Sequence, residues 1–141
     1  MKVPLIIVVD ADAIIAQAFT HDTNHDLAMK ISNHLHTVHA RMIYPSTAIM
    51  EAITVLQTKL NSGATAYGTA VVFTDPHVEV AEVGHEDLQN AVDYFSPTGS
   101  KKHTLFDCVI AAIAEKNKAD AIFSFDKFYK TKGFTLASEL K

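Results

Sequence analysis

The chain has 141 residues and a mass of 15.4 kDa, a length that suits one compact domain. Hydrophobic residues make up 48% of it and charged residues 20%, a composition that excludes a disordered or low-complexity chain. No segment approaches the roughly 20 consecutive apolar residues of a membrane helix, and the single cysteine, Cys108, excludes an internal disulfide. We therefore expect one cytoplasmic domain over residues 1–141 with no membrane association.

The net charge of −4 is unevenly distributed along the chain. Residues 1–100 carry 4 Lys/Arg against 11 Asp/Glu, a net charge of −7, whereas residues 101–141 carry 8 against 5, a net charge of +3. A basic C-terminal third can contact the phosphates of a nucleic acid, although solvated helix and loop faces are the ordinary alternative. The candidate phosphate-binding residues are Lys101, Lys102, Lys127 and Lys130.

Short apolar runs alternate with longer amphipathic stretches. The runs are rich in β-branched residues, as in strands that helices cover on both faces, and the longer stretches repeat apolar residues at helical spacing. In chain order we expect a strand at residues 5–9, helices at 13–19 and 24–39, a strand at 42–44, helices at 46–61 and 64–73, a strand at 78–83, helices at 86–95 and 104–117, and a strand at 121–125. This order predicts an α/β fold with a mainly parallel sheet.

Four acidic residues lie where these elements begin or end. Asp10 and Asp126 directly follow the first and last expected strands, while Glu51 and Asp107 lie in the first turns of two helices. Ligands bind beyond the carboxyl ends of parallel strands, so we expect these four side chains to converge there. Two carboxylates about 6 Å apart repel by about 3 kcal/mol at an effective dielectric near 20, which favours a bound cation. An all-oxygen set of ligands is typical of Mg²⁺ or Mn²⁺.

Each acid also has an ordinary structural explanation. Asp10 and Asp126 can each cap the helix that follows, and Asp107 stands three residues after Thr104, as in a capping box. Glu51 falls opposite the apolar stripe of its helix, which predicts exposure to solvent. The matched placement of Asp10 and Asp126 after two buried strands, rather than any single residue, favours a site.

Three segments carry a resemblance to a known family: VVDADAIIA near the start, PSTAIMEAITVL in the middle, and TLFDCVIAAIAEKNKADAIFSFDKFYKTKGF near the end. With these segments the sequence resembles the PIN-domain family, which includes the VapC-like toxins of type II toxin-antitoxin systems. The resemblance covers nearly the whole chain and implies a PIN-like three-layer α/β/α sandwich. It also implies a Mg²⁺- or Mn²⁺-dependent ribonuclease that leaves 5′-phosphate and 3′-hydroxyl ends, forms a homodimer and pairs with a cognate antitoxin protein.

The resemblance assigns the site residue by residue. The catalytic and metal-binding acids of the family fall on Asp10, Glu51, Asp107 and Asp126. We expect the three Asp residues to bind the metal directly or through water, and Glu51 to bind it through water or to orient the attacking water. Ser124 falls where the family often has a small hydroxyl residue. Position 12, where the family usually has Ser, Asn or Thr, is Asp12 here, and this extra carboxylate is expected to support the metal ligands or to cap the following helix.

Two other functions are compatible with parts of the pattern. Haloacid-dehalogenase-type phosphatases also end a strand on Asp-x-Asp, which would make Asp10 the nucleophile and Asp12 the acid/base, but Ile14 stands where that motif usually has a hydroxyl residue. A catalytically silent PIN fold that acts as a binding module is the non-enzymatic alternative, and the presence of all four acids argues against it. We therefore expect a metal-dependent ribonuclease that acts as the toxin of a toxin-antitoxin pair, with a stand-alone processing nuclease as the alternative.

Overall fold

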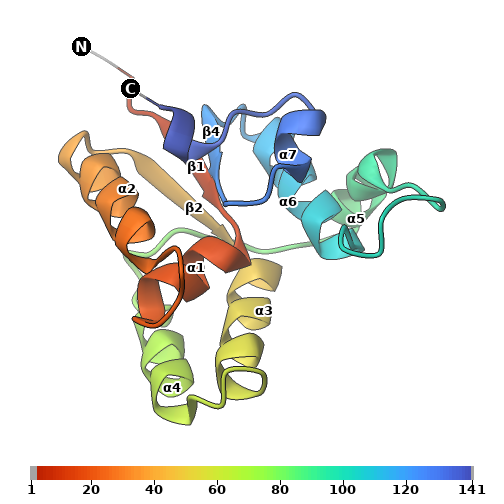
Figure 1. The fold of residues 1–141 in the computed structure, drawn as a ribbon. Helices are drawn as coiled ribbons and strands as arrows, with labels where there is room; N and C mark the ends of the chain where they lie inside the picture. The colour runs from red at the N-terminus through yellow and green to blue at the C-terminus, as the bar shows by residue number, and fades with distance from the viewer. Residues whose placement is uncertain (1–2, 141) are drawn as a thin grey trace.

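A four-stranded parallel sheet forms the centre of the fold in the computed structural model, which describes residues 3–140. In the order of the sheet, its strands are β3 (Val80–Ala81), β2 (Arg41–Pro45), β1 (Ile6–Val9) and β4 (Ala121–Phe123). Figure 1 shows helix α2 (His25–Thr37) on one side of this sheet and helices α5 (His85–Ala91) and α6 (Leu105–Lys116) on the other. The expected α/β fold, with helices on both sides of a parallel sheet, is confirmed.

Strand β1 is apolar because its neighbours cover it on every side. It lies between β2 and β4 in the sheet, and Val8 and Val9 are completely buried. The register pairs Val9 with Phe123, and the amide of Asp10 donates to the carbonyl of Phe123 at 3.0 Å. The first residues after β1 and β4 therefore emerge side by side, at what we call the carboxyl edge of the sheet.

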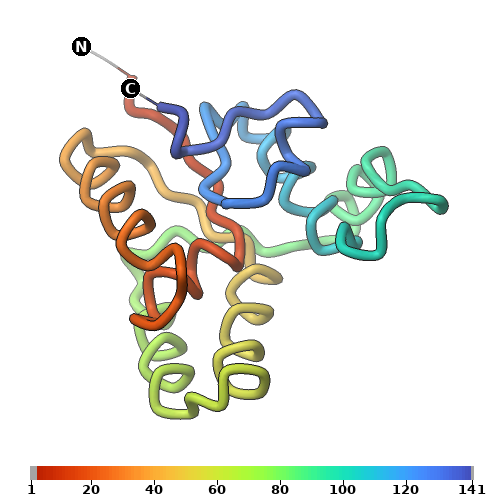
Figure 2. Tube along the Cα trace, viewed as in Figure 1, coloured from red at the N-terminus to blue at the C-terminus, as the bar shows by residue number. Residues whose placement is uncertain are grey.

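Several helices begin at this carboxyl edge. Only Asp10 separates β1 from α1 (Ala11–Ala18), and α3 (Ser46–Gln57) follows β2 without a break. Helix α7 (Phe128–Thr131) begins shortly after β4. α3 and α4 (Gly63–Val72) form a hairpin that extends away from the sheet (Figure 1). Figure 2 shows the chain then passing from α4 through β3 and across the molecule to α5. The carboxyl edge is thus lined by the first turns of helices from distant parts of the sequence.

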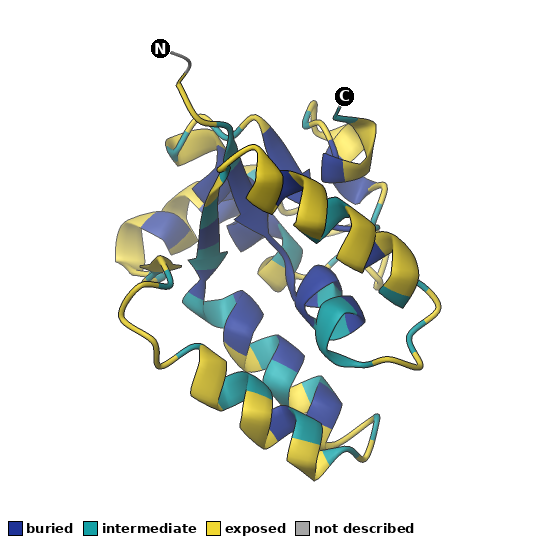
Figure 3. Ribbon diagram, turned by 90° about the vertical axis from the view of Figure 1, so that its left-hand side faces the viewer, coloured by how far each residue is buried: buried dark blue, intermediate teal, exposed yellow. Residues whose placement is uncertain are grey.

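Helix α6 is buried along most of its length. Residues 108–114 are all buried and consist only of small or apolar side chains, as a helix that is covered all round requires. It packs against β1 and α5. Figure 3 shows the buried strands at the centre of the molecule and the exposed outer faces of α2 and α4. This buried frame holds the first turn of α6 in place at the carboxyl edge.

Some element boundaries differ from the predictions. The strand predicted at 121–125 ends already at Phe123, because the amide of Phe125 donates to the Asp12 carboxylate at 2.8 Å instead of continuing the sheet. The helix predicted at 46–61 ends at Gln57, and Asn61 adopts a left-handed φ of 47°. The strand predicted at 78–83 contains only the two residues of β3. The helices predicted at 13–19, 24–39, 64–73 and 104–117 agree with the structure to within two residues at each end.

The C-terminal part of the fold was the hardest to predict. The helix predicted at 86–95 divides into α5 and the 3-10 helix η1 (Val92–Tyr94), while α7 and a second 3-10 helix, η2 (Ala137–Glu139), were not predicted. An isolated parallel bridge between Ile122 and Leu136 extends the sheet beyond β4. No helix among residues 3–140 is both long enough and apolar enough to cross a membrane.

Candidate active site

Asp10 is a buried carboxylate that serves as the N-cap of α1. Its side chain is only 5% exposed, and its Oδ1 accepts a hydrogen bond from the amide of Ala11 at 2.7 Å. Its Oδ2 accepts a hydrogen bond from the hydroxyl of Tyr129 at 2.6 Å. Burial raises the pKa of Asp10 well above its usual value, and the charges of Asp12 and Asp107 raise it further. The capping alternative is therefore correct for Asp10, but capping leaves its charge uncompensated.

Asp12 is directed towards the chain that follows β4. Its Oδ2 accepts hydrogen bonds from the hydroxyl of Ser124 at 3.0 Å and from the amide of Phe125 at 2.8 Å. Burial is the main cause that raises the pKa of Asp12 to about 6. Its Oδ1 is buried and has no hydrogen-bond partner within residues 3–140. The prediction that Asp12 caps the helix is wrong, because Asp10 is the N-cap and Asp12 lies within the first turn.

Ser124 connects Asp12 to Asp126. The serine is 1% exposed, and its hydroxyl oxygen accepts a hydrogen bond from the amide of Asp126 at 3.1 Å while its proton is donated to Asp12. Asp126 in turn accepts at Oδ1 from the amide of Phe128 at 2.9 Å, which supports the first turn of α7. The same oxygen lies 3.4 Å from Nε2 of His103. Asp12 therefore fixes the position of Asp126 through a serine that was predicted to belong to the site.

Asp107 both caps α6 and faces the carboxyl edge. Its Oδ2 accepts a hydrogen bond from the amide of Thr104 at 3.0 Å, as the capping-box pattern predicted. Its Oδ1 lies 3.4 Å from the hydroxyl of Tyr129, the same hydroxyl that donates to Asp10. Burial raises the pKa of Asp107, and the charge of Asp126 raises it further. The structural and functional explanations for Asp107 are thus compatible.

Glu51 lies in the second turn of α3 and is half-buried. Its pKa is raised by burial first, and then by the charges of Asp107 and Asp12, while Lys59 acts in the opposite direction. The helical-wheel prediction of an exposed Glu51 is wrong. The wheel shows only which side of α3 carries Glu51, and it does not show that α3 begins at the carboxyl edge, where other elements cover that side. Glu51 therefore lies close enough to Asp107 and Asp12 for their charges to act on it.

The acids are not arranged as a closed coordination shell. Within residues 3–140, no group of three or more His, Cys, Asp or Glu side chains is placed so that it could hold a metal ion as it stands. The hydroxyl of Tyr129 lies between Asp10 and Asp107 and contacts both carboxylates. The chemistry of the donors nevertheless suits a hard divalent cation, because all the nearby acids offer oxygen and their raised pKa values show that positive charge would stabilise them.

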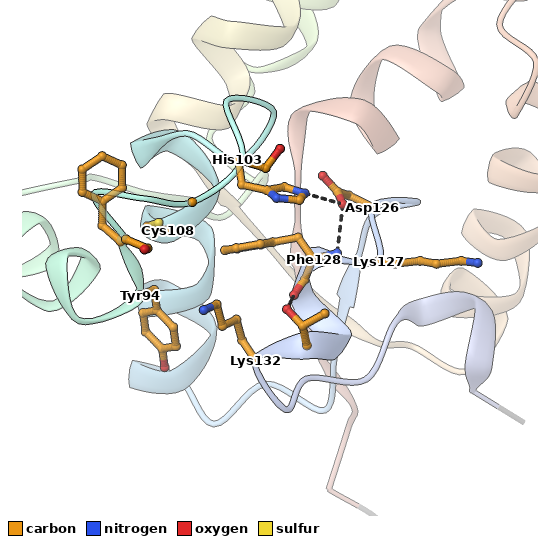
Figure 4. A pocket seen from close by; sticks show the side chains of 12 residues that line it. Tyr94, His103, Cys108, Asp126, Lys127, Phe128 and Lys132 are labelled. Carbon is orange, nitrogen blue, oxygen red and sulfur yellow. Dashed lines mark hydrogen bonds and ion pairs between the residues drawn. The ribbon is translucent and has the colours of Figure 1, made fainter.

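The predicted phosphate-binding lysines differ in their surroundings. Lys101 and Lys102 are exposed on the loop that precedes α6, and the Lys127 side chain extends from beside Asp126 towards the outside (Figure 4). Lys130 instead forms an ion pair with Glu139 at 3.1 Å. This ion pair makes Lys130 the weakest of the four candidates.

Two residues of the site were missed in the sequence. Tyr129 is completely buried and donates to a carboxylate 119 positions away in the chain. His103 lies beside Asp126 and stacks on Phe128, with 4.6 Å between the ring centroids. The sequence offers only their positions as a signal. Tyr129 stands three residues after Asp126, and His103 stands immediately before the N-cap of α6. Neither position implies a contact without the fold.

Comparisons with known proteins agree with this architecture. Residues 7–134 match the family model of the PIN domain. Among solved structures, VapC20 of Mycobacterium tuberculosis, a sarcin-ricin loop cleaving toxin, superimposes with a TM-score of 0.78 at 17% identity, covering 92% of this chain and 96% of that one. PAE2754 from Pyrobaculum aerophilum gives a TM-score of 0.57 at 22% identity, covering 94% and 84%. No curated protein sequence matches the chain. Because the family model spans most of its length, the chain belongs to the PIN-domain family.

Proposed function

We propose that the protein is a ribonuclease that hydrolyses RNA phosphodiester bonds with Mg²⁺ or Mn²⁺ at its carboxyl edge. Membership of the PIN-domain family supports a nuclease, and the shared fold with VapC20 supports RNA as the substrate. The observation that carries the proposal is the placement of Asp10, Glu51 and Asp107 at one edge of the sheet, where burial raises the pKa of each and the charges of neighbouring acids raise it further. Keeping these buried, neighbouring carboxylates ionised costs folding free energy, and a bound cation would offset that cost.

The residues at the edge fit a divalent ion. Asp10, Asp107 and Asp126 would hold it through carboxylate oxygens, which Mg²⁺ and Mn²⁺ prefer. The buried Oδ1 of Asp12 has no hydrogen-bond partner within residues 3–140, so it could accept a hydrogen bond from a water at the ion. When bound, a divalent ion neutralises charge on the scissile phosphate and makes water a stronger nucleophile.

The remaining side chains position these acids and the substrate. Glu51 approaches the acids from α3, a different direction, and is assigned to orienting the attacking water. Tyr129 holds the Asp10 carboxylate through its hydroxyl hydrogen bond, and Ser124 holds Asp126. The exposed ammonium groups of Lys101 and Lys127 are assigned to the phosphates on either side of the scissile bond. Hydrolysis would leave a 5′-phosphate and a 3′-hydroxyl.

The structure does not favour the phosphatase alternative. A phosphatase pair would need Asp12 to exchange a proton with a substrate bound at Asp10. Asp12 instead directs one oxygen to Ser124 and Phe125 and buries the other. We therefore retain the nuclease, and we further propose that it acts in the cytoplasm as a homodimeric toxin with a cognate antitoxin protein. An adjacent gene encoding a small DNA-binding protein would support this pairing.

RNA cleavage by the purified protein tests the proposed activity. Single-stranded RNA should be cleaved in Mg²⁺ or Mn²⁺ and left intact in excess chelator, and restoring the metal should restore cleavage. Asp10→Asn and Asp126→Asn should each lower kcat/KM by at least about 100-fold. Asp26→Asn, the same substitution on the exposed surface of α2, is the matched control and should leave the rate unchanged. Undiminished cleavage by either site variant would refute the assignment.

A further inference from the structure

A pocket of about 410 Å³ adjoins the carboxyl edge on the side of Asp126. It is lined by the end of η1, the loop that leads to α6, one residue of α6, and both ends of α7 with the residues that flank them. Figure 4 shows Tyr94 and Phe128 on opposite sides of this pocket, with the Lys132 side chain between them and His103 beside Asp126. Its volume lies within the range of sites for small organic groups. Of the residues that line it, only Asp126 and the lysine that follows it have a role assigned above.

Aromatic rings and two lysines, Lys127 and Lys132, line the pocket. The ring of His103 stacks on that of Phe128 with an interplanar angle of 26°, and the Lys132 ammonium lies 5.5 Å from the centroid of the Phe128 ring. Phe95, on the loop side, is 48% exposed. Within residues 3–140, Lys132 forms no ion pair. Aromatic faces beside a free ammonium suit a planar base attached to a phosphate.

The pocket is continuous with the candidate active site. Asp126 belongs to both, and its Oδ1 lies 3.4 Å from Nε2 of His103 in the pocket wall. A phosphodiester held at the acids would therefore place the nucleoside on its Asp126 side at the mouth of the pocket. The hydroxyl groups of Ser96 and Ser100, which also line it, can hydrogen-bond to the edge of a base.

We propose that this pocket binds one unpaired nucleobase of single-stranded RNA, next to the scissile phosphate. This inference rests on the ribonuclease function proposed above and adds the conformation of the substrate. A base can enter the pocket only after it has left its stack, so the substrate is a single strand or a loop rather than a continuous duplex. The RNA is thereby positioned by one stacked base at the pocket and by phosphate contacts elsewhere.

RNA with a single abasic nucleotide tests the pocket during cleavage. One abasic position next to the cleaved bond should lower kcat/KM of the wild-type protein by at least about 10-fold, within the range of base–aromatic stacking. Phe95→Ala should cleave the intact RNA at least about 10-fold more slowly and lose most of its sensitivity to that abasic position, because both changes remove the same contact. Phe106→Ala is the matched control, since Phe106 is also 48% exposed but does not line this pocket, and it should retain the full sensitivity. Equal sensitivity in Phe95→Ala and wild type, or no sensitive position, would overturn the inference.

A binding measurement separates this inference from the proposed activity. Asp10→Asn, which leaves the pocket intact, is mixed with oligouridine that contains one 2-aminopurine, and stacking is followed by fluorescence quenching. Quenching that Phe95→Ala removes and Phe106→Ala preserves would support the base pocket, even if no RNA were cleaved and the proposed function had failed. Quenching that is absent, or unaffected by Phe95→Ala, would overturn the pocket and leave metal-dependent cleavage standing.

Discussion

Replacing Asp12 by Asn should stabilise the metal-free protein at neutral pH. Asp12 is buried, and its pKa is raised from 3.8 to about 6, mainly by burial. At about 1.36 kcal/mol per pH unit, the ionised carboxylate costs about 3 kcal/mol of folding free energy at pH 7.5. Asparagine keeps an oxygen that can accept from Ser124 and Phe125 but carries no charge. Its NH₂ group takes the place of the oxygen that has no hydrogen-bond partner. Burying this unpaired donor lowers the expected stabilisation by about 1 kcal/mol.

The sign of the pH dependence follows from the direction of the pKa shift. Between pH 3.8 and about 6, the unfolded chain has already lost the Asp12 proton while the folded protein still holds it, so the wild type loses stability as pH rises. Asp12→Asn lacks this loss. The stability of the variant relative to wild type should therefore rise by about 2 kcal/mol from pH 4.5 to pH 7.5. The removal of the Asp12 charge also relieves Asp10, which acts in the same direction.

Urea denaturation in chelator, followed by circular dichroism at several pH values, measures this difference. Asp26→Asn on α2 controls for the general effect of the same substitution at an exposed position. A difference between Asp12→Asn and wild type that does not change with pH would refute the reasoning, and so would a variant that loses stability relative to wild type as pH rises.

Two further predictions concern the contacts of the other acids. Tyr129→Phe deletes the hydrogen bond to the buried Asp10 carboxylate, so the free energy of unfolding in chelator at pH 7.5 should fall by about 1.5 to 3 kcal/mol. Urea denaturation measures this change, and an unchanged value would show that the bond contributes nothing. Saturating Mg²⁺ should raise the melting temperature of the wild type by relieving carboxylate repulsion, and Asp107→Asn should reduce that rise. Scanning calorimetry measures both, and a wild-type melting temperature that Mg²⁺ does not change would count against a cation at the edge.

Periodicity and element order were sufficient to predict the frame of the site. The apolar run that becomes β1 has no polar residue until Asp10, so its burial and the position of the acid at its end could be read together. The same reasoning placed Asp126 after β4. Because all parallel strands end at one edge, the placement of both acids at that edge required only the fold class.

The contacts between side chains could not be predicted in the same way. Ser124 reaches Asp12 across 112 positions of sequence, and Tyr129 reaches Asp10 across 119. Such contacts depend on where β4 ends and how α7 turns back, and the sequence pattern extends that strand two residues too far. The burial of Glu51 could not be predicted for a different reason. Helical periodicity shows which side of α3 a residue lies on, but the surroundings of Glu51 depend on where the first turns of α3 lie in the fold.

Direct measurement of Mn²⁺ binding tests the central claim, which is that the acids at the carboxyl edge hold a divalent cation. Electron paramagnetic resonance of Mn²⁺ titrated into the RNA-free wild-type protein should show saturable loss of the free-ion signal. Asp10→Asn and Asp126→Asn should each weaken binding at least about 10-fold, whereas Asp26→Asn should bind like wild type. Wild-type protein that leaves the Mn²⁺ signal unchanged, or site variants that bind Mn²⁺ as tightly as wild type, would contradict the account.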